Sequence, residues 1–203
     1  MMGLPDLGEP FITELKSIDP KSDYALFGEW AMSVYRGRWA DAVRAVEAFP
    51  EHLEASGLQP QMMGWTLGCA GDIGEAIERM EQTDFSALEG GFAFLGRILL
   101  AAYRGDRPLP EPDAVQREAA WRDWQYSAMM ADAHAQAGEH EEALRWLSHG
   151  VEKGFFQARF MSELDAHLVG LRDDPRFKQL VKQAQLGAAR MRGLIEDRRR
   201  GGG

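Results

Sequence analysis

The chain has 203 residues, of which 45% are hydrophobic and 27% charged, and these values exclude a collagen-like or disordered chain and leave room for one repeat array or two small domains. Charge is uneven: 28 acidic and 14 basic residues precede Arg172, whereas 9 basic and 4 acidic residues follow from there, so the acidic body excludes nucleic acid as the expected partner. No apolar run is long enough to span a bilayer and no signal peptide is recognisable, which predicts a cytoplasmic protein without membrane insertion.

Residues 1–22 are rich in turn signals and predict an N-terminal segment with one short helix, over 10–18, that caps the rest of the chain. Apolar residues then follow helical spacing from Tyr24 to Val34 and predict a helix over 23–36. A partner helix is expected over 39–49, on the other side of Gly37.

A second pair of helices is expected over 59–70 and 73–80, with a turn at Gly71. Gly64 and Gly68 share one face of the first of these helices, where they reduce helix propensity and permit a close helix crossing. The only cysteine, Cys69, cannot form an internal disulfide and is interpreted as a small core residue in a reducing compartment.

The third unit is irregular. Its first helix is expected over 87–103, but Pro108, Pro110 and Pro112 stand where the second helix should begin, and proline is tolerated only in a first helical turn. The loop is therefore expected to be longer, with a shortened helix starting near Asp113. No breaker separates Glu118 from Trp124, so one continuous helix over 113–137 is the alternative.

A last hairpin is expected on either side of Gly138, with acidic residues at the positive end of its second helix. The pattern changes after Gly154, and a final helix is predicted from Asp174, as N-cap, and Pro175 to about residue 197. Its arginine-rich end could touch an acidic partner, but a solvated helix end is the favoured interpretation. Residues 201–203 are expected to be a flexible tail.

Four hinge glycines carry the main inference. They stand at positions 37, 71, 105 and 138, so the steps are 34, 34 and 33 residues. Three of them are followed by alanine five residues later, at Ala42, Ala76 and Ala143. This is the period of the tetratricopeptide repeat, a helix–turn–helix unit that buries its apolar face by stacking on neighbours. The predicted fold is an all-α solenoid over residues 23–154 with a C-terminal capping region over 155–200.

The stretch from Ala128 to Leu180 resembles the C-terminal end of tetratricopeptide regions in bacterial multidomain regulators. The matching residues are Glu142, Ala143, Leu144, Trp146, Leu147, Gly154, Phe155, Leu171, Arg172, Asp174, Pro175, Arg176, Phe177 and Leu180. The resemblance implies a closing element in which Phe177 and Leu180 cover the last hairpin, and it implies no chemistry of its own.

In tetratricopeptide arrays, the concave wall is lined by first-helix residues about six, ten and thirteen positions before the hinge glycine. Carried onto this chain, the resemblance gives the candidate groove residues Tyr24, Phe27, Gln61, Trp65, Leu95, Leu99, Gln125 and Asp132. This wall is mostly apolar and aromatic. It lacks the Lys, Arg and Asn set that grips a terminal carboxylate in the chaperone-binding members of the family.

A search for catalytic or metal-binding motifs finds none. There is no phosphate-binding Gly-rich loop, no nucleophile elbow and no paired-histidine zinc motif. The five histidines are scattered, and no cysteine or carboxylate stands at ligand spacing from them, so packing or capping roles are expected and no metal or cofactor is predicted.

The leading hypothesis is a non-catalytic adaptor that binds a partner peptide or helix in the concave groove. The alternative is a regulatory module that encloses a small molecule, which a deep closed pocket would favour. A third hypothesis is a homo-oligomerisation unit, and an enzyme ranks last.

Overall fold

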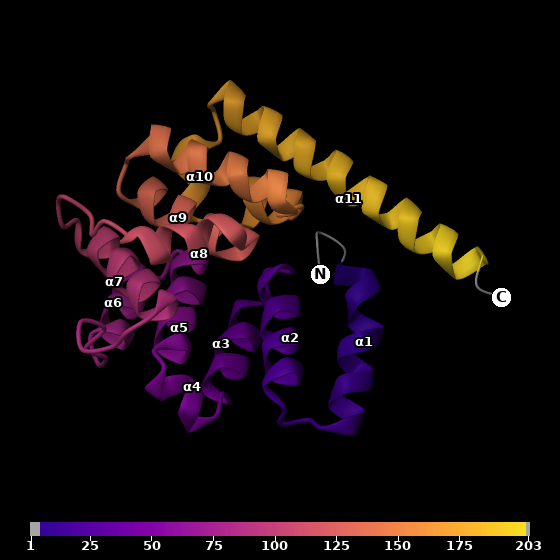
Figure 1. Cartoon of the computed structure of the whole chain (residues 1–203), viewed down its shortest axis with the longest axis horizontal. Coiled ribbons are helices and arrows are strands. Elements are labelled where there is room, and N and C mark those ends of the chain that lie inside the picture. The colour runs from indigo at the N-terminus through magenta and orange to yellow at the C-terminus, as the bar shows by residue number, and fades with distance from the viewer. Residues whose placement is uncertain (1–4, 202–203) are drawn as a thin grey trace.

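The computed structural model describes residues 5–201, and within that range the chain is helical with no β-strand (Figure 1). In chain order the elements are α1 (Pro5–Ile18), α2 (Asp23–Val34), α3 (Trp39–Glu47), α4 (Glu51–Ala55), α5 (Leu58–Ala70), α6 (Ile73–Met80), α7 (Gly91–Arg104), α8 (Ala114–Arg122), α9 (Trp124–Gln136), α10 (His140–Lys153), η1 (Phe160–Leu164), η2 (His167–Leu171) and α11 (Pro175–Gly201). The all-α prediction is therefore confirmed.

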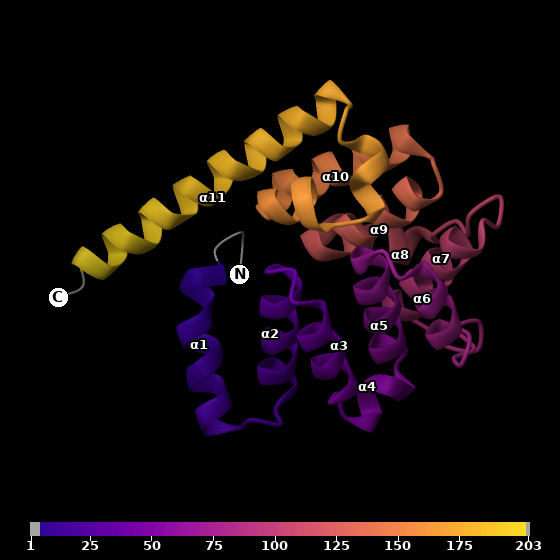
Figure 2. The same ribbon diagram turned by 180° about the vertical axis from the view of Figure 1, so that it is seen from behind.

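Consecutive helices pack in pairs, α2 with α3, α5 with α6, and α9 with α10. Contacts of α3 with α5, of α5 with α7 and of α7 with α9 join one pair to the next. The two views in Figures 1 and 2 show the helices following one another around the molecule from α1 to α10. One continuous core runs through all of these pairs.

The hinge glycines all take the left-handed backbone conformation. The φ angles of Gly37, Gly71, Gly105 and Gly138 are 71°, 91°, 76° and 76°. An L-residue pays about 1–2 kcal/mol in this region, so glycine is the residue that ends each first helix cleanly. The positive φ expected at Gly138 is confirmed, and the same conformation recurs at each of the other three positions.

Several predicted boundaries need correction. Helix α1 begins at Pro5 rather than at residue 10, and the short helix α4 was not predicted. The continuous helix over 113–137 does not form, because Asp123 is extended and its carboxylate accepts a hydrogen bond of 2.7 Å from the Gln125 N–H. Asp123 thus ends α8 and caps α9, and this local capping chemistry competes successfully with helix continuation.

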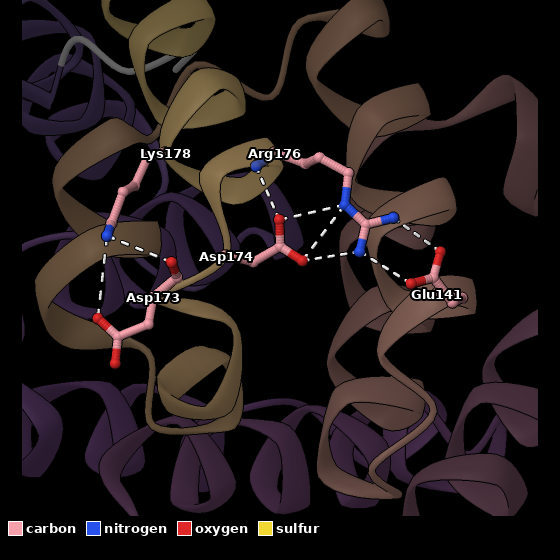
Figure 3. A network of polar contacts seen from close by, with 5 residues as sticks. All are labelled: Glu141, Asp173, Asp174, Arg176 and Lys178. Atoms are coloured by element: carbon pink, nitrogen blue, oxygen red, sulfur yellow. Dashed lines mark hydrogen bonds and ion pairs between the residues drawn. The ribbon is translucent and has the colours of Figure 1, made fainter.

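After Gly154, η1 and η2 lead to α11. Phe177 and Leu180, which were predicted to cover the last hairpin, are both buried, and α11 packs on α10. The Arg176 guanidinium forms two hydrogen bonds of 2.8 Å with the Glu141 carboxylate and one of 2.7 Å with Asp174 Oδ2 (Figure 3). These charged contacts hold the start of α11 on the start of α10.

Helix α11 extends beyond the predicted end at residue 197 and runs back across the molecule toward α1 (Figures 1 and 2). The Arg192 guanidinium lies 2.9 Å from the Asp6 carboxylate, so an ion pair links the last helix to the first. Across the described part of the chain, no helix combines the length and apolarity needed to cross a membrane.

Candidate binding groove

A groove of about 420 Å³ lies among the N-terminal parts of the first helices of the pairs. Its lining comes from α2, α4, α5, α7 and α9 and from Phe49 and Asp123 just outside them. The residues are Asp23, Tyr24, Phe27, Phe49, Leu53, Leu58, Gln61, Met62, Phe92, Asp123, Gln125, Tyr126 and Met129. We call this set the groove.

Helix caps set the position of the groove residues. The Ser22 side chain caps α2 by accepting a hydrogen bond from the Ala25 N–H, and Asp123 caps α9 in the same way. Tyr24 and Gln125 therefore lie in the first turns of their helices, at the open end of the face. Tyr24 is 81% exposed, so this rim of the groove is open to solvent.

The groove is mostly apolar and aromatic, and its few charged residues are all negative. Asp23 and Asp123 are its charged residues, and both are acidic. At the floor, the Gln61 amide group donates to Met129 Sδ at 3.4 Å, while Gln61 Oε1 has no hydrogen-bond partner. This oxygen is buried, and a buried acceptor without a donor costs free energy. Burial, with a smaller contribution from Asp123, raises the pKa of the Tyr126 hydroxyl to about 12, so this phenol is neutral and can donate.

Four of the eight predicted groove residues line this cavity. They are Tyr24, Phe27, Gln61 and Gln125, which come from α2, α5 and α9. All four stand ten or thirteen positions before their hinge glycine. The structure therefore brings together the side chains from the N-terminal halves of these helices.

The other four predicted residues do not reach the groove surface. Trp65, Leu95, Leu99 and Asp132 are each at most 1% exposed and belong to the interior. The Trp65 indole N–H donates a hydrogen bond of 2.7 Å to Asp132 Oδ2, so two of these side chains are partners of each other. The expectation that they form part of an open wall is corrected.

A later segment of the same chain covers the C-terminal half of the face formed by α2, α5, α7 and α9. We call residues 155–171 the closing segment. The Phe160 ring lies 5.8 Å from the Trp65 ring and 5.2 Å from the Tyr35 ring, measured between centroids. Further along the segment, the Ala166 N–H donates to the Cys69 carbonyl at 3.0 Å. Trp65 and Asp132, each six residues before its hinge glycine, are thus buried under the closing segment, which the repeat pattern does not describe. Leu95 and Leu99 belong to the hydrophobic core.

A second hollow, of about 790 Å³, lies where the loop over 108–112 faces the turn between α9 and α10. Its walls include the His134 and Glu139 side chains, whose Nδ1 and Oε2 atoms lie 2.6 Å apart. This hollow uses none of the predicted groove residues. It is formed by the irregular loop of the third unit together with α9, α10 and the turn between them.

The structure also gathers residues that sequence spacing kept apart. Cys69, Asp132, Asp165 and His167 are buried together, although 98 positions separate the first from the last. The expectation that no cysteine or carboxylate stands near a histidine is therefore wrong for His167. The sequence offered one signal of this cluster, which is that Asp132 lies among the apolar residues of its helix.

Comparison of the chain with protein-family models, with curated protein sequences and with solved structures gives no match. The interpretation of the groove therefore rests on its own geometry and chemistry.

Proposed function

We propose that the protein is a non-catalytic adaptor of the tetratricopeptide type, whose groove binds an amphipathic segment of a partner protein. Stacked helix pairs with left-handed glycines at 34-residue intervals support the solenoid interpretation. The observation that carries the binding proposal is the groove itself, which joins five helices into one apolar hollow with a solvent-exposed rim.

The groove suits anchor side chains presented by a peptide. Aromatic rings of Tyr24, Phe27 and Phe92 surround it, and methionines at its floor can adapt to different anchors. Its volume lies near the lower end of the range for ligand sites. The small-molecule hypothesis calls for an enclosed cavity, and the open rim at Tyr24 favours the peptide instead.

The charges of the groove select a basic partner segment. Asp23 and Asp123 stand at its edge, and the body of the chain before Arg172 has a net charge of −14. A lysine or arginine beside the apolar anchors would meet these carboxylates. We therefore infer that the partner presents leucine or phenylalanine anchors next to a cationic residue.

Fluorescence anisotropy with labelled helical peptides tests this proposal. One peptide carries leucine and phenylalanine anchors with lysines between them, and its matched counterpart carries glutamates in place of the lysines. We expect the lysine peptide to bind and the glutamate peptide not to. Tyr24→Ala combined with Gln125→Ala should weaken binding about tenfold, because both side chains stand at the mouth of the groove.

Phe11→Ala is the matched control, because Phe11 is an aromatic residue with 59% exposure on α1, outside the groove. It should leave the affinity unchanged. Asp123→Asn keeps a capping side chain on α9 but removes the charge, so it should weaken the lysine peptide selectively. Equal affinity of the wild type and the Tyr24/Gln125 variant would refute the assignment of this groove.

A further inference from the structure

A cluster of four ligand-capable side chains lies under the closing segment, outside the groove. Cys69 comes from α5, Asp132 from α9, Asp165 from the turn between η1 and η2, and His167 from the start of η2. One donor atom from each residue lies within 4.8 Å of the donor atoms of the others. All four residues are at most 3% exposed, so the cluster is sealed from solvent.

Hydrogen bonds hold the side chains of Asp132, Asp165 and His167. Some of their partners belong to the cluster, and others lie outside it. Asp132 Oδ2 accepts from the Trp65 indole at 2.7 Å. His167 Nδ1 lies 2.8 Å from Asp165 Oδ1, and His167 Nε2 lies 2.9 Å from the Tyr103 hydroxyl. The Tyr103 hydroxyl also has an alternative acceptor, the Gly64 carbonyl at 3.2 Å, so it can release the imidazole without losing a partner.

One oxygen of the cluster remains without a donor. Asp165 Oδ2 is buried and has no hydrogen-bond partner, whereas Asp165 Oδ1 receives both the backbone N–H and Nδ1 of His167. Cys69 and Asp132 both interact with the Asp165 carboxyl. An unpartnered carboxylate oxygen that is fully buried beside a thiol and a second carboxylate calls for a positive species.

The surrounding residues do not supply that charge. Two carboxylates face one imidazole within the cluster. The nearby guanidinium of Arg172 donates to the backbone carbonyl of Asp165 at 3.0 Å rather than to its carboxylate.

We propose that this cluster is a structural zinc site formed by Cys69, Asp132, Asp165 and His167. Thiolate, imidazole and carboxylate are the ligands that zinc uses, and four protein ligands without an open position are typical of a structural site. Tetrahedral zinc with bonds of about 2.0–2.3 Å places its donor atoms about 3.3–3.8 Å apart. The ligand atoms here lie within 4.8 Å of one another, so small side-chain movements of up to about 1 Å would complete the site. On binding, the Cys69 thiol releases its proton to solvent as the sulfur coordinates the metal.

The proposed ion would join three parts of the fold. It would connect α5, α9 and the closing segment, so its binding free energy would stabilise the covered half of the helical face. The role is independent of peptide binding in the groove.

The test uses the full chain, unfolded in urea and refolded with Zn²⁺, with Co²⁺ or with a chelator, so that the buried site can load. We expect one metal ion per chain by elemental analysis and a higher Tm with Zn²⁺. The Co²⁺ protein should show the visible bands of tetrahedral cobalt and a thiolate charge-transfer band. Cys69→Ser should abolish the charge-transfer band, and His167→Gln should weaken binding at least about tenfold.

His149→Gln is the matched control, because His149 is also buried but bonds the Trp121 carbonyl outside the cluster. It should bind metal like the wild type. Asp132→Asn keeps the shape of the side chain and should reduce metal affinity while the chain remains folded. Absence of metal from the refolded wild type would overturn the proposal. A thiolate charge-transfer band that persists in Cys69→Ser would overturn it as well. A metal-free wild type that Asp132→Asn stabilises would instead assign the cluster to a proton shared by the two carboxyls.

Discussion

The two halves of the face formed by α2, α5, α7 and α9 differ in their exposure to solvent. The N-terminal half stays open as the groove, with Tyr24 exposed and Gln61 Oε1 unpartnered. The C-terminal half is covered by the closing segment, which buries Trp65 and Asp132. The same helices thus provide a surface at one end and a core at the other, and the difference is made by a segment far away in the sequence.

This contrast separates residues for binding from residues for stability. Side chains of the covered half have lost their solvent contact on folding, so changing them should cost free energy of unfolding. Side chains at the exposed rim of the open half can change with little effect on the fold.

The largest effect is expected for Phe160→Ala. The Phe160 side chain is 1% exposed and contacts the rings of Tyr35, Trp65 and Phe155. Its truncation should lower the free energy of unfolding by about 3–5 kcal/mol, measured by urea denaturation. Tyr24→Ala, in the open half, should change it by less than about 0.5 kcal/mol. A cost below about 1 kcal/mol for Phe160→Ala would mean that the closing segment is not packed on the helices.

A somewhat smaller effect is expected for Gly68→Ala. A Cβ atom at this position would lie 2.0 Å from the Tyr103 hydroxyl oxygen and 2.4 Å from His167 Nε2. Both rings would have to move, which should destabilise the fold by about 1–3 kcal/mol in the same urea assay. Gly150→Ala, in α10, is the control, since the nearest atoms to its added Cβ would lie at an ordinary distance of 3.5 Å. Equal stability of the two variants would contradict close packing at Gly68.

The hinge glycines provide the next comparison. Gly71 has a φ of 91°, and its added Cβ would meet only Ala166 at an ordinary distance of 3.7 Å. Gly71→Ala should therefore cost about 1–2 kcal/mol through backbone strain alone. Gly74→Ala, three residues later in α6, meets no atom within 4 Å and should stabilise the chain by about 0.5 kcal/mol. Thermal and urea denaturation should both show that Gly71→Ala lowers the stability of the fold and that Gly74→Ala raises it.

Sequence reasoning reached the local parts of this fold. Period, glycine spacing and apolar stripes predict most helix positions, and α6 has the predicted bounds. These features depend on residues a few positions apart, so they are visible in the chain itself. The cap at Asp123 shows the limit, because one side chain decided between a continuous and a broken helix.

The candidate site was predictable only in part, for a tertiary reason. Tyr24 and Gln125 could be placed because a repeat puts its first helical turn at a constant position. Trp65 and Asp132 could not be placed, because the segment that covers them begins after Gly154 and follows no repeat. The grouping of Cys69 with His167 likewise depends on how the closing segment lies, which spacing along the chain does not encode.

The smallest predicted effect concerns the surface contact that holds α11. Hydrogen bonds from the Arg176 side chain and backbone lower the pKa of Asp174 to about 2 from 3.8, and Arg176 lowers the pKa of Glu141 as well. A carboxyl whose pKa is lower in the folded state stabilises the fold above its unfolded pKa, and this contribution disappears as pH falls toward the folded pKa. The contact should therefore weaken between about pH 4 and pH 2.

Arg176→Gln should remove this pH-dependent contribution. The difference in urea midpoint between the wild type and Arg176→Gln should be present near neutral pH and should shrink as the pH falls, toward zero below about pH 2, where both carboxyls are protonated in both proteins. Lys178→Gln is the control, because it also removes a positive charge from the start of α11 but pairs with Asp173, at 3.9 Å, rather than with Asp174 (Figure 3). Its difference from the wild type should vary less over the same range. If both variants followed the same pH curve, general surface charge, and not the geometry of the Arg176 contact, would account for the attachment of α11.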